Sequence, residues 1–292
     1  MKLEGVYTAL VTPFGQDGGV DEKALRRLVD FQIEGGVQGL VPVGTTGESP
    51  TLGGEECRQV IRIVVEQARG RVPVIAGAGS NCTSEAIEYT RDAKAVGADA
   101  TLQVGPYYNK PTSQGFLLHF RAIADAVDLP LVVYNIAGRT GKNIDNPTML
   151  ELAAHRNIVA VKEASGDINQ MMDLIAKKPA GFTVLSGDDN LVFPLMALGG
   201  KGVISVASNI VPDRMAALVK AALKGEWETA RKMHYEMLPL FRAIFIETNP
   251  IPIKAALAMK GMCAEIYRLP MCPMGPKNRD ALAATLREMK VL

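Results

Sequence analysis

The sequence predicts a (β/α)8 TIM barrel followed by a C-terminal helical appendage. Three observations carry this prediction: short β-branched apolar runs recur along the chain, amphipathic stretches separate them, and the alternation stops after Gly225. Strands that alternate with helices form parallel βαβ units. About eight such units in a chain of 292 residues favour a closed barrel over an open sheet.

The predicted strands are short and mostly apolar. They are VYTALVT from Val6, GLVPVG from Gly39, VPVIAGAG from Val72, ATLQVG from Ala100, LVVYNI from Leu131, IVAVKEA from Ile158, TVLSGDD from Thr183 and GVISVAS from Gly202. A doubly wound sheet is the alternative arrangement of such units. Its usual Gly-x-Gly-x-x-Gly turn after the first strand is absent, because VTPFGQDGG stands there instead.

Helical patterns separate the strands and continue alone after residue 225. Expected helices span residues 21–35, 83–96, 113–127 and 147–155, with a capping pattern at Thr83-Ser84-Glu85 and Pro147 in a first turn. Further on, a long helical pattern over 226–246 is interrupted by Pro239, and helices over 253–262 and 278–290 follow a proline-rich turn at 249–252. We therefore expect a barrel over residues 1–224 and a helical region over residues 225–292.

The composition argues against several classes of protein. The chain is 48% hydrophobic with a formal net charge of +1 and no basic stripe, which argues against a nucleic-acid partner. No apolar run reaches the ~20 residues that span a bilayer, and the N-terminal MKLEGVYTALVTPF has no signal-peptide pattern. The cysteines and histidines are scattered without a CxxC pair, so we expect no metal site. These features predict a soluble, cytoplasmic protein without membrane contact.

In a barrel of this kind, functional residues lie at the C-terminal ends of the strands and in the loops after them. The chain places there Gly44-Thr45-Thr46-Gly47-Glu48, Pro106-Tyr107-Tyr108-Asn109, Tyr134-Asn135 with Arg139-Thr140, Lys162, Gly187-Asp188-Asp189 and Ile204-Ser205. Functional side chains are therefore expected among these residues.

Lys162 is the most informative of them, because it ends an apolar strand in NIVAVKEASG (157–166). Strand residues alternate between two faces, so Lys162 and Glu163 cannot both point into the barrel. An inward amine loses hydration, which lowers its pKa, and a neutral amine attacks a carbonyl to form a Schiff base. The alternative is a lysine that reaches solvent or pairs with a carboxylate.

The neighbouring strand ends offer partners for such chemistry. Tyr134 is a candidate acid/base, or else a packed aromatic with a solvated hydroxyl. Thr45 and Thr46 lie in a glycine-bracketed turn that suits a carboxylate, unless the glycines serve the turn alone. Arg139 follows Tyr134 in a short loop, where it either binds a second carboxylate or remains a solvated charge.

Two further pairs favour structural roles. Asp188 and Asp189 resemble a metal or acid/base pair, but no third ligand lies nearby in the sequence, so they are typical of a turn or helix cap. Tyr107 and Tyr108 are typical of a lining or interface pair. Their position in a loop after a strand also allows a functional tyrosine.

Several ordered motifs together resemble the dihydrodipicolinate synthase / N-acetylneuraminate lyase family. They are GTTGES (44–49), PYYNKP (106–111), YNIAGRT (134–140), VKEASG (161–166), LSGDD (185–189) and GVISV (202–206). The likeness extends from VTPF near the N-terminus to LPMCPM near the C-terminus, so it covers nearly the whole chain.

The resemblance implies a barrel with C-terminal helices that assembles as a homotetramer of tight dimers. It implies condensation of pyruvate with L-aspartate-4-semialdehyde, without a cofactor, on the route to lysine. Lys162 would form the Schiff base with pyruvate. Thr45, Tyr134 and Tyr108 would form a proton relay, with Tyr108 reaching in from a neighbouring subunit.

The resemblance also implies how the substrates are held. Thr45 and Thr46 would bind the pyruvate carboxylate, and Arg139 would bind the semialdehyde carboxylate. Gly187 and Ile204 would contribute backbone carbonyls near the site. In one departure from the family pattern, Ala137 replaces a proline before Arg139 and removes a φ constraint.

A second departure concerns feedback inhibition. Asn81, Glu85 and Tyr107 match effector-site residues of the family's lysine-sensitive members. Gly54 and Cys57 stand where those members have histidines. We therefore expect weak or absent inhibition by lysine.

Two other functions remain as alternatives. A related Schiff-base lyase or aldolase for N-acetylneuraminate or a keto-deoxy-sugar acid would share Lys162, Tyr134 and Thr45. Arg139 argues against it, because a second carboxylate site suits a short acidic aldehyde. A non-catalytic barrel that senses a keto acid or lysine is least favoured, because the groups needed for catalysis are all in place.

Overall fold

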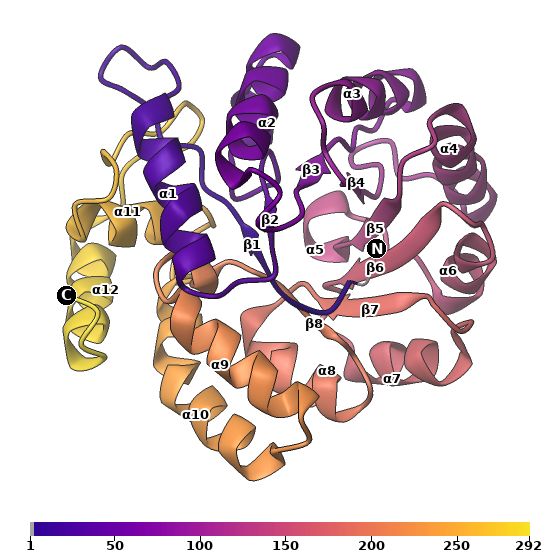
Figure 1. Cartoon of the computed structure of the whole chain (residues 1–292). Coiled ribbons are helices and arrows are strands. Elements are labelled where there is room, and N and C mark those ends of the chain that lie inside the picture. Colours follow the sequence, from indigo (N-terminus) through magenta and orange to yellow (C-terminus); the bar gives the residue numbers. More distant parts are fainter. Residues whose placement is uncertain (1–2) are drawn as a thin grey trace.

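The computed structural model describes residues 3–292, which form a barrel of parallel strands surrounded by helices (Figure 1). The strands are β1 Gly5–Ala9, β2 Gly39–Val41, β3 Ile75–Gly77, β4 Ala100–Val104, β5 Leu131–Asn135, β6 Ile158–Glu163, β7 Thr183–Ser186 and β8 Gly202–Ser205. They pair in the order β2-β1-β8-β7-β6-β5-β4-β3, and a parallel bridge between Leu40 and Val74 joins the two outer strands. The predicted (β/α)8 barrel is confirmed, and the doubly wound sheet is excluded.

The helices form the outer layer, and the C-terminal ones add to it on one side (Figure 1). The helices are α1 Glu22–Glu34, α2 Gly54–Ala68, α3 Thr83–Ala95, α4 Ser113–Ala126, α5 Ala137–Thr140, α6 Asn146–Ala153, α7 Ile168–Lys177, α8 Val192–Ala197, α9 Pro212–Leu223, α10 Trp227–Ala243, α11 Ile251–Met259 and α12 Pro276–Glu288. Short 3-10 turns η1 Ser49–Thr51, η2 Asp189–Leu191 and η3 Ala207–Asn209 follow β2, β7 and β8. No helix within residues 3–292 is both long and apolar enough to cross a bilayer.

Side-chain caps begin α1, α4, α6 and α7, whereas α3, α8 and α10 begin without one. The Asp21 carboxylate accepts a hydrogen bond from the backbone N–H of Ala24 at 2.9 Å and so begins α1. The capping pattern predicted at Thr83 is wrong, because Cys82 is the N-cap of α3 and its side chain makes no capping bond. The Thr83 hydroxyl instead pairs with Nδ1 of His119 on α4, at 2.9 Å. A contact with the neighbouring helix has replaced the local cap.

The C-terminal helices share a core with the barrel. α10 runs without interruption through Pro239, so the predicted break there is wrong. α10 packs on α9, and α12 packs on α10 and α11. One apolar cluster joins Leu28 and Val219 of the outer barrel helices to Leu240 and Leu282 of the appendage. The boundary that we proposed after residue 224 therefore lies between two parts of the chain that share one continuous hydrophobic core.

Strand β6 contains an irregularity that decides which side chains face the barrel interior. Leu131 pairs with Ile158 and Val132 pairs with Ala160, so Val159 is an extra residue in β6. Ile158 packs in the cluster between barrel and helices, whereas both Val159 and Ala160 belong to the interior cluster. Alternation then resumes from Ala160.

Candidate active site

Lys162 lies at the C-terminal end of β6 with its side chain toward the barrel interior. Ala160 and Ala164, the residues two before and two after it, belong to the interior cluster, and Val161 belongs to the outer one. The Lys162 side chain is buried, with 5% of the residue exposed. Glu163 is buried on the other face, where Asn135 and the backbone N–H of Ser165 donate hydrogen bonds to it. The prediction that only one of these two neighbours faces inward is confirmed.

Tyr134 on β5 is the immediate neighbour of this amine. The two residues are paired in the β5–β6 register, and Nζ of Lys162 lies 4.0 Å from the centroid of the Tyr134 ring. A side-chain hydrogen bond joins Tyr134 to Thr45. The barrel therefore brings together an amine, a phenol and a hydroxyl from three strand ends.

Burial changes the acidity of both groups. Loss of hydration lowers the pKa of Lys162 from its ordinary 10.5 to about 8, although the nearby carboxylates of Asp188 and Asp189 oppose this shift. Burial raises the pKa of Tyr134, with a smaller contribution from Asp188. At neutral pH the phenol keeps its proton, while part of the Lys162 population is a neutral, nucleophilic amine.

Gly187 and Ile204 complete the surroundings of the amine. A Cβ atom at Gly187 would lie 2.6 Å from Cβ of Ala164 and 3.1 Å from Cε of Lys162, so only glycine fits beside this lysine. Ile204 on β8 is fully buried in the interior cluster that also holds Tyr134. Gly187 therefore touches the Lys162 side chain, and Ile204 forms part of the apolar wall.

The turn after β2 holds Thr45 and Thr46 in a constrained backbone. The N–H of Gly47 donates to the carbonyl of Gly44 at 3.0 Å, and Glu48 adopts the left-handed region with φ of 56°. A glutamate in this region is uncommon and is tolerated where the surroundings fix it. Thr46 is buried, and Thr45 is half-buried beside Tyr134.

Two residues of the C-terminal region hold this turn from behind. The buried amine of Lys254 on α11 forms an ion pair with the buried carboxylate of Glu48. The backbone N–H of Arg268 donates to the same carboxylate at 3.3 Å. Sequence reasoning missed this pair because no local pattern connects residues 206 positions apart.

Arg139 lies on α5, a single helical turn that follows β5. Ala137 begins this turn, a position that the family's proline also suits, so its presence leaves the helical conformation intact. Nη2 of Arg139 donates to the backbone carbonyl of Asn249 at 3.0 Å, and the side chain is otherwise exposed. The guanidinium is thus anchored at one corner and open to a ligand.

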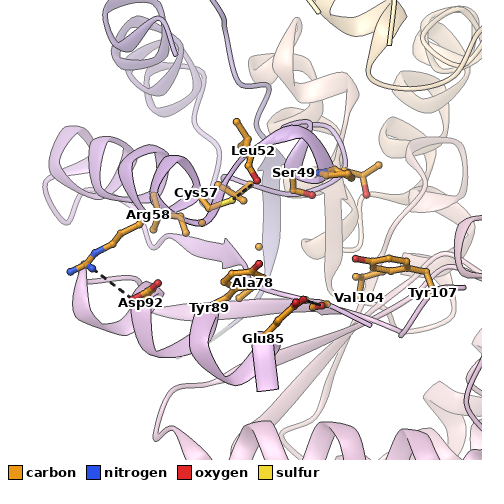
Figure 2. Close-up of a pocket in the computed structure, with 18 of the residues that line it drawn as sticks. Ser49, Leu52, Cys57, Arg58, Ala78, Glu85, Tyr89, Asp92, Val104 and Tyr107 are labelled. Atoms are coloured by element: carbon orange, nitrogen blue, oxygen red, sulfur yellow. Dashed lines mark hydrogen bonds and ion pairs between the residues drawn. The ribbon is translucent and has the colours of Figure 1, made fainter. Parts of the chain in front are cut away.

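A cavity of about 410 Å³ extends outward from this region between α2 and α3. Thr45 and Arg139 line its inner part, and Cys57, Glu85 and Tyr107 line the remainder. In Figure 2 the Arg58–Asp92 ion pair lies at one end of the cavity and Tyr107 at the other.

The three predicted effector residues lie together beside this cavity. The Asn81 side chain donates to the backbone carbonyl of Tyr107 at 3.2 Å. The Glu85 carboxylate accepts from the Ser80 hydroxyl at 2.7 Å. Burial raises the pKa of the Cys57 thiol to about 11, so the thiol is neutral at physiological pH. The cavity wall at Cys57 therefore carries no charge or imidazole.

Two predicted groups behave differently from the rest. Tyr108 is 89% exposed with a φ of 67°, so this chain does not bring it to its own Lys162. Asp189, by contrast, accepts hydrogen bonds from the Ser205 hydroxyl and from the backbone N–H groups of Val206 and Ala207. Its predicted role in a turn is confirmed. Within residues 3–292, no group of three or more His, Cys, Asp or Glu side chains is arranged for a metal ion.

Comparison with known proteins agrees with this geometry. The sequence model described as "Dihydrodipicolinate synthetase family" matches residues 2–289. The 4-hydroxy-tetrahydrodipicolinate synthase of Koribacter versatilis is 56% identical over 293 residues, covering 100% of this chain and 98% of that protein. The crystal structure of dihydrodipicolinate synthase from Aquifex aeolicus superposes with a TM-score of 0.97 at 46% identity over 99% of both chains. The chloride-inhibited dihydrodipicolinate synthase from Acinetobacter baumannii, complexed with pyruvate, superposes with a TM-score of 0.98 at 43% identity over 100% of both chains. This chain belongs to the dihydrodipicolinate synthetase family.

Proposed function

We propose that the protein condenses pyruvate with L-aspartate-4-semialdehyde to give 4-hydroxy-tetrahydrodipicolinate, in the diaminopimelate route of lysine biosynthesis. The single observation that carries this proposal is the buried amine of Lys162 against the Tyr134 ring, with an Nζ-to-centroid distance of 4.0 Å. Family membership and the pyruvate complex of a relative support the choice of substrates.

The first half of the reaction joins pyruvate to the chain. The neutral amine of Lys162 attacks the ketone carbon, and water leaves as the imine forms. The protonated imine withdraws electrons, so a methyl proton is lost and an enamine forms. Tyr134, hydrogen-bonded to Thr45, carries protons to and from the bound substrate. The Thr45–Thr46 turn holds the pyruvate carboxylate.

The second half forms the carbon–carbon bond and releases the lysine. The enamine carbon attacks the aldehyde carbon of the semialdehyde, and the aldehyde oxygen takes a proton. The amino group of the former semialdehyde then attacks the imine carbon, closes the ring and displaces the Lys162 amine. Arg139, held by the Asn249 carbonyl, binds the semialdehyde carboxylate. Since the amine itself supplies the electron sink, the reaction needs no cofactor.

The exposure of Tyr108 supports an assembly of several copies of the chain. Its 89% exposure and positive φ support a role in the site of a neighbouring copy, within a homotetramer of tight dimers. Mixing Lys162→Met subunits with Tyr108→Phe subunits tests this role. A mixed dimer has one site with both wild-type residues, so activity should return on mixing. No recovery despite subunit exchange would place Tyr108 in the site of its own subunit, and a fully active Tyr108→Phe variant would place it outside the proton relay.

The primary experiment is borohydride trapping with pyruvate followed by peptide mapping, with semialdehyde turnover measured in parallel. We expect a reduced pyruvate adduct on Lys162 and none on Lys254, the matched buried lysine. An adduct without semialdehyde turnover would favour the related sugar-acid lyase. Pyruvate binding without an adduct would favour a non-catalytic sensor and reject Lys162 as the nucleophile.

A further inference from the structure

Asn249 contacts both groups to which the proposed function assigns substrate carboxylates. It lies just before α11, and only 5% of the residue is exposed. Its side-chain Nδ2 donates a hydrogen bond to Oγ1 of Thr46 at 3.0 Å. Its backbone carbonyl accepts from Nη2 of Arg139 at 3.0 Å. One residue of the C-terminal region thus joins two residues that lie on separate loops of the barrel.

The side-chain contact fixes the direction of the Thr46 hydroxyl. A hydroxyl has one proton to donate and two lone pairs that accept. Because Asn249 donates, Thr46 is the acceptor in this contact, and its own proton is directed elsewhere. A directed O–H donor binds an anion better than a freely rotating one, because no rotamer freedom is lost on binding.

The same amide carries a structural cost that a purely structural role does not explain. Within residues 3–292, Oδ1 of Asn249 is buried and has no hydrogen-bond partner. An unpaired buried acceptor is unfavourable for the folded state. A smaller apolar residue would avoid this cost, so the presence of the amide fits a function of its Nδ2 group.

We propose that Asn249 is a positioning residue that orients the Thr46 hydroxyl toward the pyruvate carboxylate through its side chain and holds Arg139 through its backbone. This inference rests on the proposed function and extends it to pyruvate recognition. It predicts different effects on the binding of the two substrates. A substitution at Asn249 removes the side-chain contact with Thr46 but keeps the backbone carbonyl that holds Arg139. Side-chain variants should therefore weaken pyruvate binding and spare the semialdehyde.

Steady-state kinetics with both substrates tests this separation in Asn249→Ala. We expect the pyruvate KM to rise about tenfold, the loss typical of one hydrogen bond, while the semialdehyde KM stays within about twofold. Thr248→Ala, at the exposed neighbouring position, is the matched control and should match the wild type. An equal rise in both KM values would assign Asn249 a general structural role and overturn the inference.

A double-mutant cycle tests whether the effect passes through Thr46. In a Thr46→Val background, Asn249→Ala should raise the pyruvate KM no further, because no hydroxyl remains to be oriented. Additive effects would overturn the inference.

The pH dependence of the pyruvate KM in Asn249→Asp is a second test, because a purely structural role of Asn249 would not change it. This variant can also be measured if Asn249→Ala folds poorly. A protonated aspartic acid can donate to Thr46 and a carboxylate cannot. The pyruvate KM of this variant, divided by the wild-type value at each pH, should fall as the pH is lowered. A flat ratio would contradict the proposal.

Two outcomes distinguish the inference from the proposed function. Wild-type protein that traps no pyruvate overturns the proposed function, whereas wild-type turnover with an unchanged pyruvate KM in Asn249→Ala overturns this inference alone.

Discussion

Two buried lysines, Lys162 and Lys254, occupy similar surroundings and have different partners. Each is at most 5% exposed, and each amine lies over an aromatic ring, 4.0 Å from the Tyr134 centroid and 4.2 Å from the Phe14 centroid. Lys254 forms an ion pair with Glu48. Within residues 3–292, no carboxylate forms an ion pair with Lys162, and Asp188 and Asp189 act on it only through space.

The difference distinguishes a lysine that is held in an ion pair from the lysine that we propose as the nucleophile. Burial lowers the pKa of both amines, but the hydrogen-bonded Glu48 opposes this shift at Lys254. The ion pair with Glu48 therefore ties the Lys254 side chain to the turn carrying Thr45 and Thr46. Lys162 has no such partner and is free to lose a proton and attack a carbonyl. Burial alone therefore does not make a lysine a nucleophile.

The largest expected effect comes from Lys162→Met. Turnover should fall more than about 10⁴-fold, because the covalent route is lost and not only a proton transfer. The variant should also be more stable at neutral pH, by up to about 3 kcal/mol, since the lowered pKa of Lys162 represents an unfavourable burial. Turnover assays and denaturant unfolding measure the two effects. A Lys162→Met variant less stable than the wild type would show that burial of the Lys162 amine is not unfavourable.

Lys254→Met should give the opposite pattern. Removing one partner leaves the Glu48 carboxylate buried and unpaired, which we expect to destabilise the fold by about 3–5 kcal/mol. The double variant Lys254→Met/Glu48→Gln should recover part of this loss. At a temperature where Lys254→Met is folded, this single variant should still trap pyruvate on Lys162. Failure to form the adduct there would give Lys254 a part in the chemistry.

Tyr134→Phe makes the surroundings of Lys162 resemble those of Lys254, because the ring stays and the hydroxyl goes. We expect kcat to fall about 10²–10³-fold with little change in melting temperature, since the lost hydroxyl is the proposed proton carrier. A similar rate with phenylalanine would show that Lys162 needs the ring alone.

The pH dependence of adduct formation sharpens the contrast further. With a pKa of about 8, the neutral fraction of Lys162 grows roughly tenfold per pH unit below 8 and levels off above it. The native-state stability should correspondingly rise between pH 8 and the higher pKa of the unfolded chain, because the unfolded state binds more protons in that window. Borohydride trapping at short times against pH measures the first trend. A plateau extending down to pH 6 would contradict the assigned pKa.

The smallest expected effect is inhibition by lysine. The cavity keeps Glu85 and Tyr107, but Gly54 and the neutral Cys57 thiol stand where histidines were expected. We expect initial rates to change little with added L-lysine, and Cys57→His to increase the response. Strong inhibition of the wild type below millimolar lysine would show that those histidines are dispensable.

The sequence predicted the barrel and which strand-end residues meet in the candidate site, because both depend on local patterns. The strand runs were distinct, and in parallel barrels their C-terminal ends converge, which brought Lys162, Tyr134 and Thr45 together. The roles of Asn249 and Lys254 were not predictable, because they act on a turn more than 200 residues away. The Thr83 cap failed for the same reason, since His119 of another helix took its hydroxyl.

The extra residue Val159 in β6 has a consequence for how such an enzyme is altered. Ile158 points outward, so uninterrupted alternation would send Val161 and Glu163 inward and leave Lys162 among the helices. The bulge shifts the alternation of side chains in β6 by one position, so Lys162 faces the interior in place of Glu163. Deleting Val159 would remove the bulge and still leave the amine inside, because Ala160 and Lys162 would then alternate regularly with the outward Ile158, so β6 can lose this residue but cannot accept a shift of one position after it.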